Sequence, residues 1–230
     1  MQKILLTVLV AGFIAGLTVF AIQSFKLTPL ILAAETYEET STAQATEMSE
    51  HEHHHDEEAW QPADGLERNA YRLLADVGMG IGFALMLVGA FSFRAETSKN
   101  MDAKSGVLWG LAGFAVFSLA PSFGLPPELP TSMAAALGDR QIWWFETAIA
   151  TAAALALIVF GRSNLLKAVG VFIMVLPHII GAPEAPLGGA VPTELNAQFA
   201  AASIATMAIF WVVLGAVSGW FYGKKSGKTA

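Results

Sequence analysis

The chain has 230 residues, of which 54% are hydrophobic and only 14% are charged, whereas soluble domains carry about 25% charged residues. The formal net charge of −6 excludes a basic nucleic-acid-binding surface, and the absence of cysteine excludes disulfides, thiolate metal ligands and cysteine catalysis. This composition predicts an all-α polytopic membrane protein. We expect residues 1–230 to form a single integral membrane domain in the lipid bilayer.

Six hydrophobic runs approach the roughly 20 apolar residues that a transmembrane helix needs. The first is longer than the usual apolar region of a signal peptide. We therefore interpret it as a retained anchor, with cleavage after Ala33–Ala34 as the alternative. The fifth is short and contains Pro177, so the sequence leaves open whether it spans fully. The six predicted spans are 4–25, 71–93, 105–123, 142–160, 165–181 and 199–222.

Helix-capping residues and glycine spacings support these boundaries. Ser105, Ser163 and Thr193 are candidate N-caps for the third, fifth and sixth helices. GxxxG spacings, which allow helix backbones to approach closely in lipid, indicate a compact bundle. They occur at Gly12/Gly16, Gly106/Gly110 and Gly215/Gly219.

The distribution of basic residues predicts the orientation. Six spans place both termini and the second and fourth connections on one side, together with nine of the 13 basic residues. Lys and Arg favour the cytoplasmic side, so we expect both termini there and the first connection outside. The nine are Lys3, Arg94, Lys99, Lys104, Arg162, Lys167, Lys224, Lys225 and Lys228, against Lys26, Arg68, Arg72 and Arg140.

The first connection contains the sequence HEHHHDEE at residues 51–58, inside a polar stretch (33–60) that we expect to be a flexible outer loop. Imidazole binds Co, Ni, Cu and Zn ions, and carboxylates add negative charge to such a site. The tract therefore predicts capture of a divalent cation without fixing which metal, and the alternative is a solvated acidic loop. The candidate metal ligands are His51, His53, His54 and His55.

Three ionisable residues fall inside predicted spans: Asp76, Glu146 and His178. Such residues usually line a cavity or pair with one another. All three lie near the outer ends of their helices, so a shared metal site is one hypothesis. The alternative is local pairing of Asp76 with Arg72, of Glu146 with Arg140, and of His178 with a carbonyl freed by Pro177.

Several segments of the chain contain Pro- and Gly-rich loop sequences. They are LTPLILAAETYEE, WQPADGLERNAYRLLADVGMGIGFAL (60–85), WGLAGFAVFSLAPSFGLPPELP (109–130), DRQIWWFETAIATAAALAL (139–157), VLPHIIGAP (175–183) and VPTELNAQFAAASIATMAIFWVVLGAVSGWFY (191–222). In this order, along nearly the whole chain, they resemble the CbtA family of predicted cobalt transporter subunits. The resemblance implies five or six spans, cobalt uptake for cobalamin synthesis and a small single-span companion subunit, CbtB.

We therefore expect a permease component of the bacterial inner membrane that imports divalent cobalt, with nickel as a second candidate. The metal ion is the transported substrate, and no organic cofactor is predicted. No Walker A, GxSxG or HExxH spacing occurs, so an enzyme is not expected. The alternatives are a membrane metal-binding sensor or assembly partner, and a membrane metalloenzyme.

Overall fold

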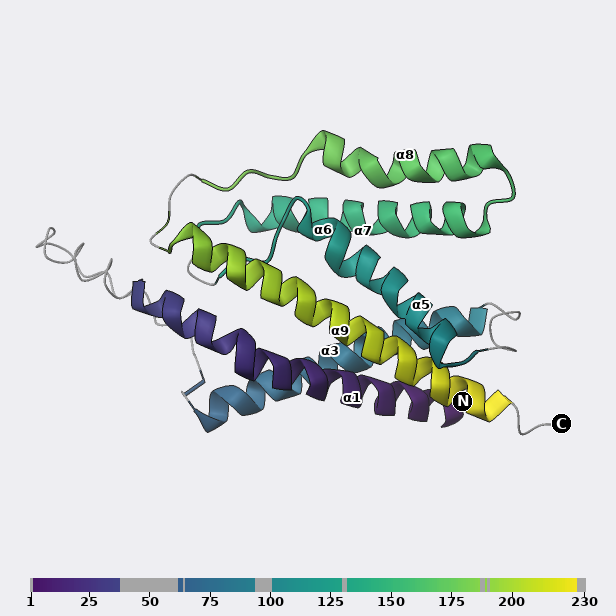
Figure 1. Cartoon of the computed structure of the whole chain (residues 1–230), viewed down its shortest axis with the longest axis horizontal. Coiled ribbons are helices and arrows are strands. Elements are labelled where there is room, and N and C mark those ends of the chain that lie inside the picture. The colour runs from purple at the N-terminus through teal and green to yellow at the C-terminus, as the bar shows by residue number, and fades with distance from the viewer. Residues whose placement is uncertain are drawn as a thin grey trace, which may run out of the picture.

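The computed structural model describes residues 2–37, 62–63, 65–93, 101–129, 132–186, 189 and 191–226. All regular structure within these ranges is helical, which confirms the all-α prediction. The chain runs back and forth along one bundle, and both termini lie at the same end (Figure 1). Its elements in order are α1 (Gln2–Lys26), α3 (Leu66–Phe93), α5 (Ala103–Phe114), η1 (Ala115–Leu119), α6 (Ala120–Ser122), α7 (Leu137–Phe160), α8 (Asn164–Ile180) and α9 (Thr193–Ser226).

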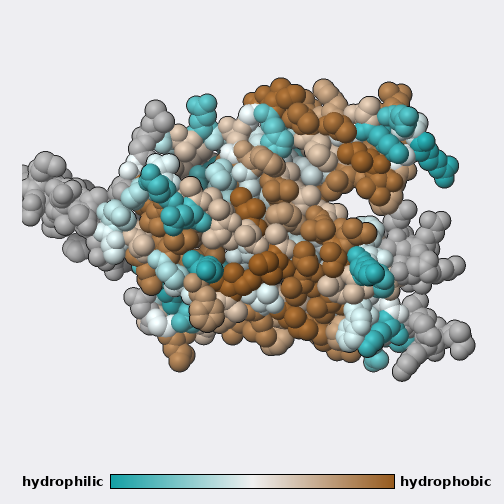
Figure 2. All heavy atoms as spheres, viewed as in Figure 1, coloured by the Kyte–Doolittle hydropathy of each residue, from teal (hydrophilic) through white to brown (hydrophobic). Residues whose placement is uncertain are grey.

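The described helices have the dimensions of a polytopic membrane protein. Figure 2 shows hydrophobic side chains across the middle of the molecule and hydrophilic ones toward its two ends. The helix α8 has 17 residues, or about 26 Å at 1.5 Å per residue, slightly less than the roughly 30 Å of a bilayer core. The five stretches that are long and apolar enough to cross a membrane are Gln2–Tyr37, Leu66–Ser92, Ala103–Ser122, Leu137–Phe160 and Thr193–Lys224.

The helices form two groups. The helix α1 packs on α3 and α9, and α5 packs on α9. The helices α7 and α8 pair with each other as a second layer, and α7 reaches the first group through η1 and α6 (Figure 1). The junction between the two groups is therefore built around the C-terminal part of the third span.

Glycine pairs hold the first group together. A β-carbon on Gly215 of α9 would overlap the carbonyl oxygen of Gly106 of α5, and one on Gly80 of α3 would overlap that of Gly12 of α1. Only residues without a side chain permit this backbone approach. The predicted role of the GxxxG spacings in close helix packing is confirmed.

The third span contains a π-helical turn, η1, that the sequence pattern did not predict. Pro121 lies two residues after the end of this turn and has no N–H to donate, which removes one backbone hydrogen bond from this part of the helix. Trp211 of α9 is almost fully buried beside the turn, where it stacks on Phe117 at 5.8 Å and donates to Ser118 Oγ at 3.3 Å. The wide turn is thus fixed against α9.

Two helix starts correct the cap predictions. Ser163 caps α8 as predicted, because its Oγ accepts from the amide of Leu166. Ser105 is not the cap of α5, because Asp102 accepts from the amide of Ser105 at 2.8 Å. In α9 the first accepting carbonyl belongs to Pro192, so Thr193 is the first helical residue and not the predicted N-cap.

Residues 33–37, which we placed in the outer loop, are helical and continue a helical segment that begins at 28. Ala34 is fully buried in one cluster with Leu129, Val191 and Phe199. This segment therefore packs against the α6–α7 connection and the start of α9. The rest of the predicted loop, 38–60, lies outside the described residues, and so do His51, His53, His54 and His55.

Candidate functional site

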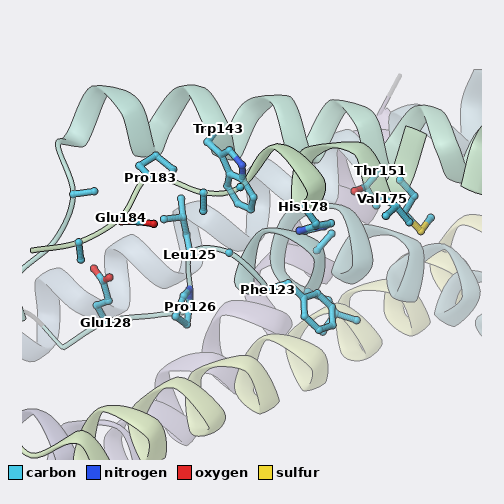
Figure 3. Close-up of a pocket in the computed structure, with 18 of the residues that line it drawn as sticks. Phe123, Leu125, Pro126, Glu128, Trp143, Thr151, Val175, His178, Pro183 and Glu184 are labelled. Atoms are coloured by element: carbon cyan, nitrogen blue, oxygen red, sulfur yellow. The ribbon is translucent and has the colours of Figure 1, made fainter. Parts of the chain in front are cut away.

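A partly open cavity of about 1010 Å³ lies between η1, α6, α7 and α8 and extends along the connections that follow α6 and α8. Most of its lining is apolar. Four polar side chains also line it: Glu128, Glu184, His178 and Thr151. Figure 3 shows Glu128 and Glu184 toward one end of the cavity. His178 of α8 lies farther from this end, and Thr151 of α7 lies farther still.

His178 lies in the last turn of α8, directly after Pro177. Its ring meets the ring of Trp143 edge-on at 5.8 Å and the ring of Phe123 at 6.0 Å. Within the described part of the chain, neither imidazole nitrogen has a hydrogen-bond partner, so the expected bond to a carbonyl freed by Pro177 is not present. The imidazole is positioned by aromatic contacts while its nitrogens stay available to a ligand.

The chain leaves α8 in a way that brings Glu184 to the cavity. Gly181 ends the helix with a φ of 94°, a left-handed conformation that favours glycine, and its amide donates to the carbonyl of Pro177. Residues 182–185 then line the cavity. Opposite them, Glu128 follows two prolines and forms an ion pair with Arg140 at 3.0 Å. One end of the cavity therefore carries two carboxylates and one guanidinium.

Thr151 has an unusual hydroxyl for a helical threonine. Thr7, Thr18 and Thr206 each donate to the carbonyl four residues earlier, at 2.7–2.9 Å. The Oγ1 of Thr151 is buried and has no hydrogen-bond partner among the described residues, and the same is true of Thr147 one turn earlier. A buried polar group without a partner is costly. Thr151 contributes to the cavity lining, but its Oγ1 is enclosed, so the side chain must rotate before the hydroxyl can meet a molecule or ion there.

Asp76 lies in a different place, between α3 and α1. Gln23 donates to Asp76 Oδ1 at 3.4 Å, while Oδ2 is buried without a partner among the described residues. Arg72, one turn earlier, donates to Ser24 of α1 and to Thr28 of the helical segment that follows α1, at 2.6 Å each. The hydrogen bonds of the Arg72 guanidinium thus go to α1 and the segment after it, and Asp76 belongs to a polar cluster of this helix pair.

Glu146 is exposed on α7. Arg140 pairs with Glu128, so the alternative pairing of Glu146 with Arg140 is wrong. The structure does not bring Asp76, Glu146 and His178 together. Among the residues that the structure describes, no group of three or more His, Asp and Glu side chains is arranged to hold one metal ion.

The sequence analysis missed Glu128, Glu184 and Thr151. The two glutamates share a detectable signal, because each directly follows proline in a loop that leaves a span: Pro-Pro-Glu128 and Ala-Pro-Glu184. Proline restricts the backbone and so holds a neighbouring charge in place. Thr151 carries no such signal, since it is one of many small residues in an apolar helix.

Comparison with known proteins gives one match. A family model described as "Probable cobalt transporter subunit (CbtA)" matches residues 1–223. No curated protein and no solved structure matches the chain.

Proposed function

The chain belongs to the CbtA family of probable cobalt transporter subunits, and from this premise we propose that it imports divalent cobalt through a bacterial inner membrane for cobalamin synthesis. The observation that carries the proposal is the cavity, which combines carboxylates at one end with an imidazole farther in that has no hydrogen-bond partner among the described residues. Nickel is the second candidate, because imidazole binds both metals.

The dimensions of the cavity suit a hydrated ion. Six waters at about 30 Å³ each occupy about 180 Å³, well below the 1010 Å³ available. An ion can therefore enter with its first shell of water. His178 would then replace one of these waters, and the Thr151 hydroxyl would bond to the ion or to a remaining water. Imidazole coordination disfavours Mg²⁺ and Ca²⁺, which prefer oxygen ligands.

The proposed direction of transport depends on orientation. The start of α1, the end of α3, the start of α5, the α7–α8 connection and the end of α9 lie at one end of the bundle (Figure 1). In the sequence, nine of the 13 basic residues fall within or next to these segments. We assign this end to the cytoplasm by the positive-inside rule. The cavity end, with Glu128 and Glu184, then faces outward.

The outer loop supplies ions to this end. The start of α3, which follows the histidine-rich tract in the sequence, lies at the end of the bundle opposite the start of α1 (Figure 1). His51, His53, His54 and His55, with the neighbouring carboxylates, would raise the local concentration of divalent cations. Because we place the tract outside, captured ions need only a short path to Glu184.

The membrane potential provides the driving force. A divalent cation that moves to a negative interior gains about 4.6 kcal/mol per 100 mV, twice the value of about 2.3 for one charge. Import therefore needs no nucleotide hydrolysis by this chain. We propose that a small single-span CbtB-type subunit completes the transporter, in keeping with the description of the family as a subunit.

The test is uptake of radioactive cobalt by bacteria that lack their other cobalt importers. The chain would be expressed alone and with the companion subunit, with nickel and zinc as competitors. We expect accumulation that unlabelled cobalt competes most effectively. Metal binding without accumulation would instead support a sensor or assembly partner, and turnover of a lipid substrate would support a metalloenzyme.

A further inference from the structure

Glu146 is a charge at membrane depth on an open surface. It lies nine residues after the start of α7 at Leu137, or about 14 Å along the helix. If α7 is centred on a bilayer core of about 30 Å, the carboxylate lies about 10 Å inside the core. Ionisable side chains within a span usually face the bundle interior, an aqueous cavity or a charged partner. Glu146 is exposed and does not line the cavity, and it has no bonding partner among the described residues.

The surface around Glu146 has the shape of a helix-packing face. Ile142, Ile149 and Ala153 are three, four or seven residues from Glu146, so all four share one side of α7. All are exposed, the two isoleucines at 60% and 68%. Ala156 continues the face toward the other end of the helix and is also exposed. Small residues at such spacing allow another backbone to come close, as the paired glycines do elsewhere in this bundle.

We propose that this face (Ile142, Glu146, Ile149, Ala153 and Ala156) binds a transmembrane helix of a different subunit. That helix presents a basic or other hydrogen-bond-donating side chain at the depth of Glu146. The carboxylate then gains the partner that the described bundle does not provide, and the isoleucines and alanines supply the apolar contact.

The charge argues against a second copy of this chain on the same face. Two copies in one membrane with the same orientation are related by an axis along the membrane normal, and a symmetric interface places identical residues opposite each other. Glu146 would then meet Glu146 at the same depth in a medium of low dielectric, where like charges repel strongly. A different subunit with a complementary donor avoids this repulsion.

Cysteine cross-linking tests the proposal, because the natural chain contains no cysteine. Ala153→Cys places one thiol on the proposed face, and Ala156→Cys provides a second position if the first variant folds poorly. Phe172→Cys is the matched control, since Phe172 is 60% exposed on α8. Each variant is expressed with the companion subunit proposed above, which carries single cysteines at successive positions of its span, and membranes are treated with a thiol cross-linker.

We expect Ala153→Cys to cross-link to the companion at least tenfold faster than Phe172→Cys. Adding Glu146→Gln should slow the reaction several-fold. Equal yields from the two cysteines, a cross-link between two copies of this chain, or no effect of Glu146→Gln would overturn the proposal. The experiment is done without cobalt, so it stands or falls separately from import, although it rests on the companion subunit named under the proposed function.

Discussion

Trp143 of α7 donates its Nε1–H to the carbonyl of Pro177 at 3.4 Å and meets the ring of His178, the next residue, at 5.8 Å. One indole therefore contacts both the proline near the end of α8 and the imidazole beside it. Phe123 holds the imidazole from another direction. Because these contacts use the faces and edges of rings, the nitrogens of His178 keep their capacity to bind a metal ion.

Replacing His178 by Asn removes the imidazole and keeps a polar side chain. We expect cobalt uptake to fall at least about tenfold, the lower range for losing a group that supports a metal site. Radioactive cobalt uptake at a limiting concentration measures the effect. The control is Ile179→Ala, next to His178 and exposed. Normal uptake by the Asn variant would show that His178 does not contact the ion.

Thr151→Val removes one hydroxyl and keeps the shape of the side chain. We expect a several-fold loss of uptake, because this hydroxyl has no bond within the described bundle and can meet an ion once the side chain rotates into the cavity. Thr147→Val is the matched control, since its hydroxyl is also buried without a described partner but its side chain does not line the cavity. Equal effects of the two substitutions would assign both to helix packing.

The ion pair between Arg140 and Glu128 sets the charge at the outer end of the cavity. Arg140→Gln removes the positive charge that pairs with the Glu128 carboxylate. The freed negative charge attracts more cations to the cavity entrance, so we expect the half-saturation concentration for cobalt to fall about threefold. Glu128→Gln should raise it by a similar factor. Uptake measured over a range of cobalt concentrations gives both values, and a shift in the same direction for the two variants would contradict this role.

The histidine tract should matter most when cobalt is scarce. Replacing His51, His53, His54 and His55 by Ala removes the proposed capture site and leaves the cavity intact. We expect reduced uptake at low cobalt and normal uptake at saturating cobalt. The same comparison in high salt provides a check, because screening weakens the attraction of the neighbouring carboxylates. A uniform loss at every concentration would place the tract in the transport step itself.

Gly215→Ala tests the close contact between α5 and α9. The added methyl group would overlap the carbonyl of Gly106, so we expect destabilisation of about 1–3 kcal/mol, as in other overpacked cores. Thermal unfolding in detergent measures it. Gly82→Ala on α3 is the control, because a β-carbon there meets no atom within 4 Å. Equal stability of the two variants would contradict this close packing of α5 on α9.

Sequence reasoning located the helices well because hydrophobic length is a local property. It also predicted a similar depth for Asp76, Glu146 and His178, since a predicted depth follows from position along a span. It could not find the direction in which each side chain points, which depends on how each helix is rotated against its neighbours. Asp76 faces α1, Glu146 is exposed on the outer surface of the bundle and His178 faces the cavity. A common depth therefore did not make a common site.

The cavity was also beyond sequence reasoning. Its lining comes from η1, α6, α7, α8 and two loops, so it exists only after the two groups of helices have packed. The π-helical turn that supplies Ala115 and Leu119 to the lining has no clear sequence signal apart from Pro121. By contrast, the end of α8 lies close to the predicted end of the fifth span at 181, where Gly181 acts on the local backbone, whereas Pro177 lies inside the helix.

The most direct measurement is cobalt uptake into proteoliposomes that contain the purified chain with its companion subunit, under an imposed potential that is negative inside. We expect radioactive cobalt to accumulate to a level that rises steeply with the potential, and His178→Asn to reduce the initial rate at least about tenfold. Cobalt levels equal to those in protein-free liposomes, or the same rate with His178→Asn, would contradict import through the cavity.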